Sequence, residues 1–83
     1  MARYRRKRPK KLAGKLRELR KRMQMTQIEL AEHLSTDSGS ISRFETGKRD
    51  PSLLEILAYS RLSGVGVEVL IDDKISLAKK RIL

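Results

Sequence analysis

Residues 26–51, TQIELAEHLSTDSGSISRFETGKRDP, contain the spacing that decides the fold. Thr26 and Glu29 stand three positions apart at the start of an apolar run. This is the capping-box arrangement, in which each side chain accepts a hydrogen bond from the backbone N–H of the other residue. The pattern predicts a helix over residues 27–34.

A second helix is predicted over residues 38–46. Asp37 is a suitable N-cap, and Gly47 supplies the left-handed conformation that ends a helix. Ile41 and Phe44 lie three positions apart and form the predicted buried pair. Only the tripeptide STD separates the two helices. Helices joined by so short a connection must cross at a steep angle, which predicts a helix-turn-helix unit.

Two further helices are predicted on either side of this unit. Upstream, four apolar residues recur at i, i+4, i+7 and i+11, and they predict a helix that begins at or shortly after Pro9. They are Leu12, Leu16, Leu19 and Met23. Downstream, Ser52 is a suitable cap for a helix over residues 53–63. The predicted inner stripe of that helix consists of Leu53, Ile56, Leu57 and Ser60.

Residues 65–72 are compatible with two structures. Val67, Val69 and Ile71 alternate as in a β-strand, whereas Val67, Leu70 and Ile71 fit one helical turn. Residue propensity favours the strand, but the short length does not decide, and both structures stay open. The same holds for the apolar residues of the tail, which are Ile75, Leu77 and Ala78.

The composition excludes several classes of protein. The 83 residues are enough for one small domain, and the absence of Cys excludes disulfides and thiolate zinc sites. His33 is the only histidine, and we expect a solvated helix position for it rather than a metal ligand. No apolar run is long enough for a membrane span, and no signal peptide is recognisable. We expect a cytoplasmic protein without cofactor, metal or membrane contact.

The positive charge is concentrated at the N-terminus. Residues 1–22 contain 12 of the 20 Lys and Arg residues and a single acid, Glu18, so this segment has a net charge of +11. The remaining residues have a net charge of −1, which gives +10 for the whole chain. Such a concentration favours nucleic acid as the partner. We expect a flexible basic arm over residues 1–9, a DNA-binding domain over 10–73, and a C-terminal extension over 74–83 for which dimerisation is an open role.

The motifs resemble a known family. The stretch LRELRKRMQMTQIELAEHLSTDSGSISRFETGKRDPSLLEILA resembles the phage repressor and Cro-like (XRE-type) helix-turn-helix family, over about residues 12–72. The specific parts are TQIELAEHL, the pair IS followed by Glu45, and GKRDPS. The resemblance implies an all-α fold, a compact five-helix bundle of the lambda-repressor type with a central helix-turn-helix. It also implies binding of operator DNA, usually as a dimer.

The resemblance also implies roles for individual residues. The expected base contacts come from the second helix of the unit, whose outward residues are Ser38, Gly39, Ser42 and Arg43. Arg43 is the principal reader, because an arginine can bind guanine O6 and N7 with two hydrogen bonds. The expected phosphate contacts are Thr26, Gln27, Thr46, Lys48 and Arg49. Arg20 and Glu45 match a family ion pair between the first and third helices. In the arm, Arg3, Arg5 and Arg6 are expected to contact the phosphates or a narrow minor groove.

Three positions depart from the family pattern. Gln24 stands where the family commonly has a glycine that ends the first helix. Ser63 stands where a buried leucine is common. Gly39 replaces a larger polar residue, which either allows closer approach to the bases or indicates that the position reads nothing.

The expected function is that of a sequence-specific transcriptional regulator. We expect a repressor that acts at the nucleoid. We expect it to bind a two-fold symmetric operator in double-stranded DNA as a homodimer, with no small-molecule ligand. Two alternatives stay open: an antitoxin that binds a toxin through residues 65–83, and an adaptor or coactivator that uses the same fold to bind protein. An enzyme is not expected, because no nucleophile is paired with a base and no phosphate-binding glycine loop is present.

Overall fold

The computed structural model describes residues 9–77, and this part of the chain contains five helices and no strand. The helices are α1 (Leu12–Arg22), α2 (Gln27–His33), α3 (Ser38–Thr46), α4 (Leu53–Ser63) and α5 (Val67–Ile71). The all-α prediction is confirmed, and residues 65–72, for which a strand was also open, are largely helical. Residues 1–8 and 78–83, which include most of the predicted arm, lie outside the described part.

The ends of α2 and α3 follow from local hydrogen bonds. Thr26 Oγ1 accepts from the Glu29 N–H at 3.0 Å, and Glu29 Oε1 accepts from the Thr26 N–H at 2.8 Å. Asp37 Oδ2 accepts from the Ser40 N–H at 3.0 Å, and α3 ends at Gly47 with a φ of +78°. The capping box, both caps and the bounds of α3 were therefore predicted correctly. Helix α2 ends one residue before the predicted Leu34, which is its C-cap.

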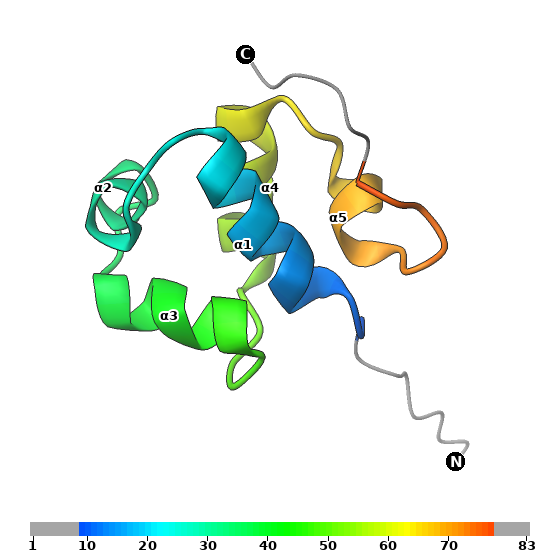
Figure 1. Ribbon diagram of the computed structural model, residues 1–83, viewed down its shortest axis with the longest axis horizontal. Helices are drawn as coiled ribbons and strands as arrows, with labels where there is room; N and C mark the ends of the chain where they lie inside the picture. The colour runs from blue at the N-terminus through cyan, green and yellow to red at the C-terminus, as the bar shows by residue number, and fades with distance from the viewer. Residues whose placement is uncertain (1–8, 78–83) are drawn as a thin grey trace.

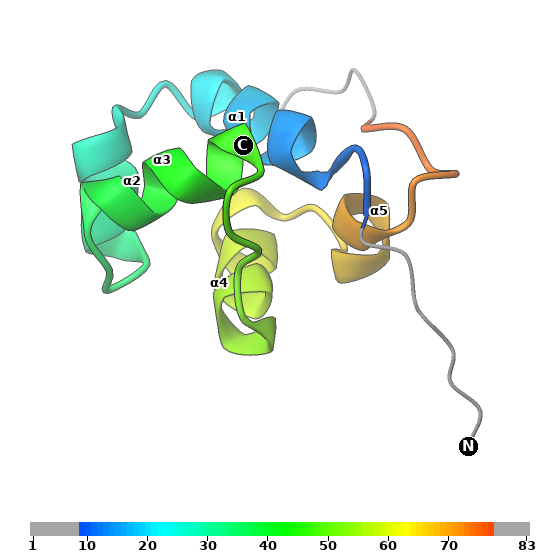
Figure 2. The same ribbon diagram turned by 90° about the horizontal axis from the view of Figure 1, so that it is seen from below.

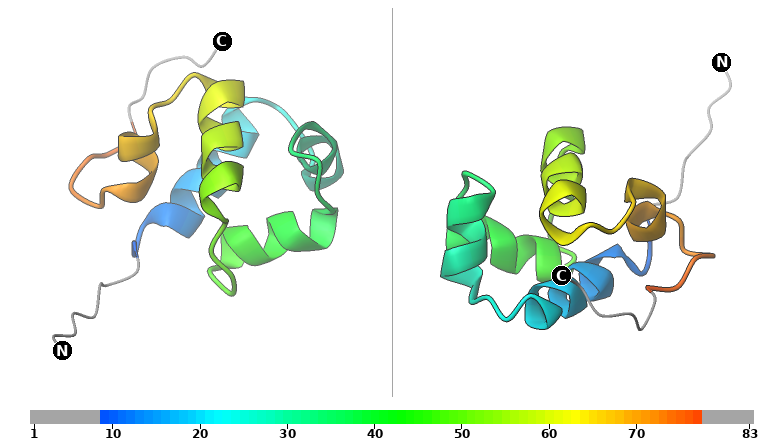
Figure 3. Two further views of the ribbon diagram at one scale, coloured as in Figure 1. Left: turned by 180° about the vertical axis from the view of Figure 1, so that it is seen from behind. Right: turned by 90° about the horizontal axis from the view of Figure 1, so that it is seen from above.

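Helix α1 supports the rest of the molecule. It contacts α3 along one side and α5 along the other. Figure 1 shows this arrangement, with α2 and α3 to the left of α1 and α5 to the right. Seen from behind, α4 lies across α1 between the helix-turn-helix pair and α5 (Figure 3). The elements on which function is predicted to depend are thus gathered on one side of α1.

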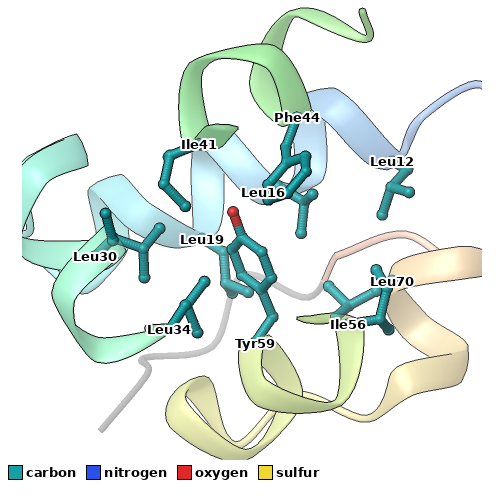
Figure 4. Close-up of a cluster of buried hydrophobic side chains, with 11 residues drawn as sticks. Leu12, Leu16, Leu19, Leu30, Leu34, Ile41, Phe44, Ile56, Tyr59 and Leu70 are labelled. Carbon is teal, nitrogen blue, oxygen red and sulfur yellow. The ribbon is translucent and has the colours of Figure 1, made fainter. Parts of the chain in front are cut away.

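The core lies where α1, α3 and α4 meet. Leu16 and Leu19 of α1 are fully buried, and so are Ile41 of α3 and Tyr59 of α4. Figure 4 shows the Tyr59 ring in the centre of this cluster, with its hydroxyl pointing toward α1 and α3. The remaining buried apolar residues are Leu12, Leu30, Ala31, Leu34, Phe44, Ile56 and Leu70. The apolar face predicted for α1 is confirmed.

The start of α1 agrees with the prediction, whereas the predicted inner face of α4 was wrong. Helix α1 begins at Leu12, shortly after Pro9, and its C-cap is Met23. In α4 the buried stripe is Ile56, Tyr59 and Ser63, whereas Leu53 is 80% exposed. The reason is visible in Figure 2, where the first turn of α4 projects away from the other helices, so an apolar residue there meets no neighbour.

Gln24 and Ser63, two of the three departures from the family pattern, have clear structural consequences. Gln24, directly after the end of α1, has a φ of +60°, a conformation that costs a side-chain-bearing residue more than glycine. Ser63 is buried, and its hydroxyl donates to the Tyr59 carbonyl at 2.8 Å. Its polar group is therefore satisfied within α4.

Candidate nucleic-acid interface

The outward face of α3 contains the predicted base-contacting residues. Burial of Ser40, Ile41, Phe44 and Glu45 turns the opposite side of the helix to solvent. That side presents Ser38, Gly39, Ser42, Arg43 and Thr46, and among them Arg43 and Thr46 are exposed. The face is small, polar and carries one positive charge. Its dimensions and polarity fit the major groove, which admits an α-helix.

The Arg43 side chain lies back along the first turn of α3. Its Nη2 is 3.5 Å from Ser40 Oγ. A Cβ atom placed on Gly39 would lie 3.6 Å from Arg43 Nη1 and 3.9 Å from Nη2. The first atom of a side chain at position 39 would therefore lie within contact distance of the Arg43 guanidinium.

A polar cluster holds this first turn. Ser40 Oγ donates to Asp37 Oδ1 at 2.8 Å and accepts from Arg49 Nη1 at 3.1 Å. The hydrogen bonds from the Ser40 hydroxyl and then from the Ser40 N–H lower the pKa of Asp37, and the nearby charge of Arg43 acts in the same direction. Ser40 was not singled out by the sequence, because its role depends on Arg49 returning to it from the following loop.

Arg49 is largely engaged within the protein. Its guanidinium lies 5.1 Å from the centre of the Phe44 ring and 3.9 Å from Glu55 Oε1. A cation over an aromatic face is a stabilising contact. The side chain is nevertheless half exposed, so one edge stays accessible to solvent. Arg49 therefore has a structural role in addition to the phosphate contact expected for it.

Thr46 and Lys48 differ in their availability. The Thr46 hydroxyl donates to the Ser42 carbonyl at 3.0 Å, so it must rotate before it can donate to a phosphate. Lys48 is exposed, and its backbone N–H donates to the Arg43 carbonyl at 3.0 Å. This bond fixes the loop from which the ammonium group extends.

We call Arg20, Met25, Gln27 and Glu45 the Arg20 cluster. Arg20 Nε and Nη2 donate to the two Glu45 carboxylate oxygens at 2.7 and 3.1 Å, and Arg20 Nη1 donates to the Met25 carbonyl at 2.9 Å. The Glu45 side chain is 3% exposed. The bond to Glu45 raises the pKa of Arg20 above its already high ordinary value. This cluster joins α1 to the end of α3.

Gln27 also belongs to the Arg20 cluster. Its amide nitrogen donates to Glu45 Oε1 at 3.2 Å, which directs the side chain toward α3. Thr26 beside it is exposed, and its hydroxyl, which accepts the capping bond, keeps a hydrogen to donate. The predicted phosphate contacts Thr26 and Gln27 thus lie together at the start of α2, with Gln27 held by the same carboxylate that holds α1.

We call the second group on α1 the Lys15 cluster. Lys15 is only 6% exposed, and its ammonium donates to the carbonyls of Val69, Asp72 and Ile75 at 2.6, 3.0 and 2.7 Å. These carbonyls come from α5 and the chain that follows it. Lys15 therefore has a structural role, although the sequence places it in the basic segment that is predicted to bind nucleic acid.

Asp73 fixes the start of α1 from the same segment. Its carboxylate accepts the backbone N–H groups of Lys10 and Lys11 at 2.9 and 3.0 Å. These two bonds lower the pKa of Asp73. Lys11 is the N-cap of α1 and has no side-chain cap bond, so Asp73 supplies acceptors that the local sequence lacks.

The start of the described chain lies beside the end of α3. A shallow pocket of about 260 Å³ separates them. It is lined by Pro9, Lys10, Leu12, Ala13, Phe44, Gly47 and Asp50. Pro9, the first described residue, therefore lies next to the loop that carries Lys48, whereas Arg3, Arg5 and Arg6 lie outside the described residues.

Other kinds of site find no support in residues 9–77. No group of three His, Cys, Asp or Glu side chains in this range is placed to hold a metal ion. Helices long and apolar enough to cross a membrane are likewise missing from this range.

The fold and the α3 face define a helix-turn-helix protein, a class in which the second helix of the unit enters the major groove. A family model described as a helix-turn-helix domain matches residues 11–72. This is well over half of the chain, and the chain belongs to that family. No curated protein matches it significantly in sequence.

A solved structure shares the fold. It is the P22 c2 repressor protein in complex with a synthetic operator in the presence of Tl⁺, with a TM-score of 0.71 and 21% sequence identity over 75% of this chain and 94% of that chain. The family match confirms the predicted helix-turn-helix family, and the likeness shows that the chain shares the fold of that repressor protein.

Proposed function

We propose that this protein is a sequence-specific transcriptional repressor that binds a two-fold DNA operator as a homodimer and inserts α3 into the major groove. The observation that carries the proposal is the division of α3 into a buried side, which anchors it, and an outward polar side with Arg43 at its centre. The likeness to the P22 c2 protein, a repressor in complex with an operator, supports the same class of partner.

The proposed contacts fall into two kinds. Arg43 reads a guanine through O6 and N7, and Ser38 and Ser42 add weaker contacts to base edges. Phosphate contacts fix the position of the domain without reading sequence. They come from Thr26 and Gln27 at the start of α2 and from Thr46, Lys48 and the accessible edge of Arg49 after α3.

The basic arm is proposed to extend binding beyond α3. Pro9 and Lys10 line the pocket beside Gly47, so the arm starts next to the phosphate-contacting loop. Deleting residues 1–8, with their five cationic side chains, is expected to reduce the slope of log K against log salt by about 0.9 for each phosphate that the arm neutralises. Fluorescence anisotropy across a salt series measures this slope. An unaltered slope would show that the arm contacts no phosphate.

A homodimer is proposed because two-fold operators require two copies of α3, about one helical turn of DNA apart. Leu53 and Leu54, at the start of α4, are 80% and 75% exposed, and they are the apolar surface that we propose the second copy covers. Sedimentation of the wild type and of Leu54→Glu tests this surface. Loss of the dimer in the variant alone supports it, whereas a monomeric wild type on operator DNA excludes it.

The whole proposal is tested by selecting DNA from a random pool with the full-length protein and footprinting the enriched sequences. We expect a consensus with two inverted half-sites and protection on one face of the duplex. Uniform binding to the unselected pool would contradict sequence-specific regulation and would favour the adaptor alternative.

A further inference from the structure

Gly39 lies in the first turn of α3, on the outward face of the helix, and a glycine within a helix lowers its stability relative to alanine. No positive φ explains its presence, since its backbone is that of an ordinary helix residue. The space around Gly39 offers a structural reason instead.

That space is taken by its neighbours. Added to Gly39, a Cβ atom would lie 3.0 Å from Asp37 Oδ2 and within 3.9 Å of both terminal nitrogens of Arg43. Helical side chains tilt toward the N-terminus, so Arg43, four residues later, naturally extends over position 39. The guanidinium then lies 3.5 Å from the Ser40 hydroxyl, and its charge acts on the nearby Asp37 carboxylate.

We propose that Gly39 is a specificity-determining residue that acts through Arg43. The missing side chain lets the guanidinium lie along the first turn of α3, beside the Asp37 carboxylate and the Ser40 hydroxyl. In that position Arg43 presents its two donors to a guanine that faces the N-terminal part of α3. Gly39 is thus a positioning residue, and it does not itself read a base. The inference rests on the proposed function and names the residue that directs its main contact.

The physical basis is preorganisation. A free arginine side chain loses several rotamers when it binds, whereas one already held in its binding position loses fewer. The hydroxyl of Ser40 has partners of its own, Asp37 at 2.8 Å and Arg49 at 3.1 Å, which orient the group that faces the guanidinium. A Cβ at position 39 would only touch Arg43, but atoms beyond it would compete with the guanidinium for these surroundings and change the base pair that Arg43 reaches.

The test compares substitutions at two glycines. Gly39→Ala adds a Cβ that lies in ordinary contact with the Arg43 guanidinium and 3.0 Å from Asp37 Oδ2, and Gly39→Leu adds bulk beyond that Cβ beside the guanidinium. Gly14→Ala and Gly14→Leu are matched controls, because Gly14 is an exposed helical glycine whose added Cβ would meet nothing within 4 Å. Base preference is the readout. It is the ratio of affinities for selected DNA and for the same DNA with each base pair replaced in turn.

Arg43→Ala identifies the base pair that Arg43 reads, with an expected loss of guanine preference of about tenfold or more. Gly39→Leu is expected to lower the preference at that same base pair by at least about threefold, and Gly39→Ala by less. The Gly14 variants leave it unchanged. In the Arg43→Ala background, Gly39→Leu is expected to have no further effect on base preference, because Gly39 is proposed to act only through Arg43.

Two outcomes would overturn the inference while the proposed function stands. One is an unchanged preference in both Gly39 variants. The other is an equal change with and without Arg43, which would show that position 39 acts alone. If the wild type itself prefers no sequence, the proposed function fails and this inference fails with it. Thermal melting checks that each variant is folded, and if Gly39→Leu does not fold, the smaller shift in Gly39→Ala decides.

Discussion

The Arg20 cluster and the Lys15 cluster are both built on a cation of α1, but they bind different partners. Arg20 holds the carboxylate of Glu45, a side chain of α3, with two hydrogen bonds. Lys15 holds three backbone carbonyls at the end of α5 and after it. One helix thus holds α3 through a side-chain pair and the C-terminal segment through main-chain acceptors.

The difference explains why one cluster was foreseen and the other was not. A pair of side chains leaves two complementary residues in the sequence, and Arg20 and Glu45 match a family pattern. Main-chain carbonyls belong to every residue, so nothing in the residue types at 69, 72 and 75 points to Lys15. Four sets of variants test this contrast between side-chain and main-chain partners.

Replacing Lys15 is expected to have the largest effect. Lys15→Met keeps the aliphatic stem but removes the ammonium, leaving three carbonyls without their charged donor. We expect a loss of about 3 kcal/mol in the free energy of unfolding, measured by urea denaturation. The control is Lys21→Met at an exposed position of the same helix, which should change stability by less than about 0.5 kcal/mol. Equal effects at the two positions would contradict the assignment of Lys15.

Glu45→Ala is expected to cost about 1–3 kcal/mol, because it leaves the largely buried Arg20 guanidinium without its carboxylate. Glu32→Ala, at an exposed position of α2, is the matched control. The two clusters share no partner, so the loss in a Lys15→Met, Glu45→Ala double variant should equal the sum of the single losses within about 0.5 kcal/mol. An unchanged melting curve for Glu45→Ala would refute the claim that the Arg20–Glu45 pair stabilises the contact between α1 and α3.

Tyr59 provides the contrasting case of a buried polar group without a partner. Within the described chain its hydroxyl makes no hydrogen bond, and burial raises the pKa of Tyr59 well above its ordinary value. Tyr59→Phe removes the unpaired group and keeps the ring, so it should increase the free energy of unfolding by about 1 kcal/mol. A decrease would show that the hydroxyl has a partner, such as a buried water.

Asp73 gives the smallest effect, and it depends on pH. Its pKa lies below the ordinary value of 3.8 because the carboxylate accepts the N–H groups of Lys10 and Lys11. The folded state therefore binds this proton more weakly than the unfolded state. The stabilisation is fully present above pH 3.8 and is lost as the pH falls below that value, through the folded-state pKa. Asp73→Asn should flatten this part of an acid titration followed by circular dichroism. An unchanged titration below pH 3.8 would contradict the claim that the Asp73 carboxylate stabilises the start of α1.

Local features of the fold were predictable because their causes lie within a few residues. Thr26 with Glu29, Asp37 with Ser40, and Gly47 each decide a helix end by a bond or conformation of their own segment. Leu53 was misassigned because its burial depends on how far α4 extends past the core. Residues 67–71 fit both a strand and a helical turn, because so short a segment cannot separate the two periods.

The candidate site divides in the same way. The outward face of α3 follows from the buried positions of Ile41 and Phe44, so its residues could be named from the sequence. The engagement of Arg49 with Ser40 and Phe44 could not, because it requires the loop after α3 to fold back over that helix. The approach of the Arg43 side chain to Ser40 and to position 39 likewise appears only in three dimensions.

The central claim is that α3 reads DNA sequence through Arg43, and it is tested most directly by comparing Arg43→Ala with Arg61→Ala. Both variants remove one exposed positive charge, and Arg61 lies on α4. Their affinities are measured for selected DNA and for a scrambled duplex of the same composition. We predict that Arg43→Ala weakens binding to the selected DNA by about tenfold or more and leaves binding to the scrambled duplex within about twofold of that of Arg61→Ala. Equal weakening on both duplexes would contradict the claim, because it would make Arg43 a phosphate contact.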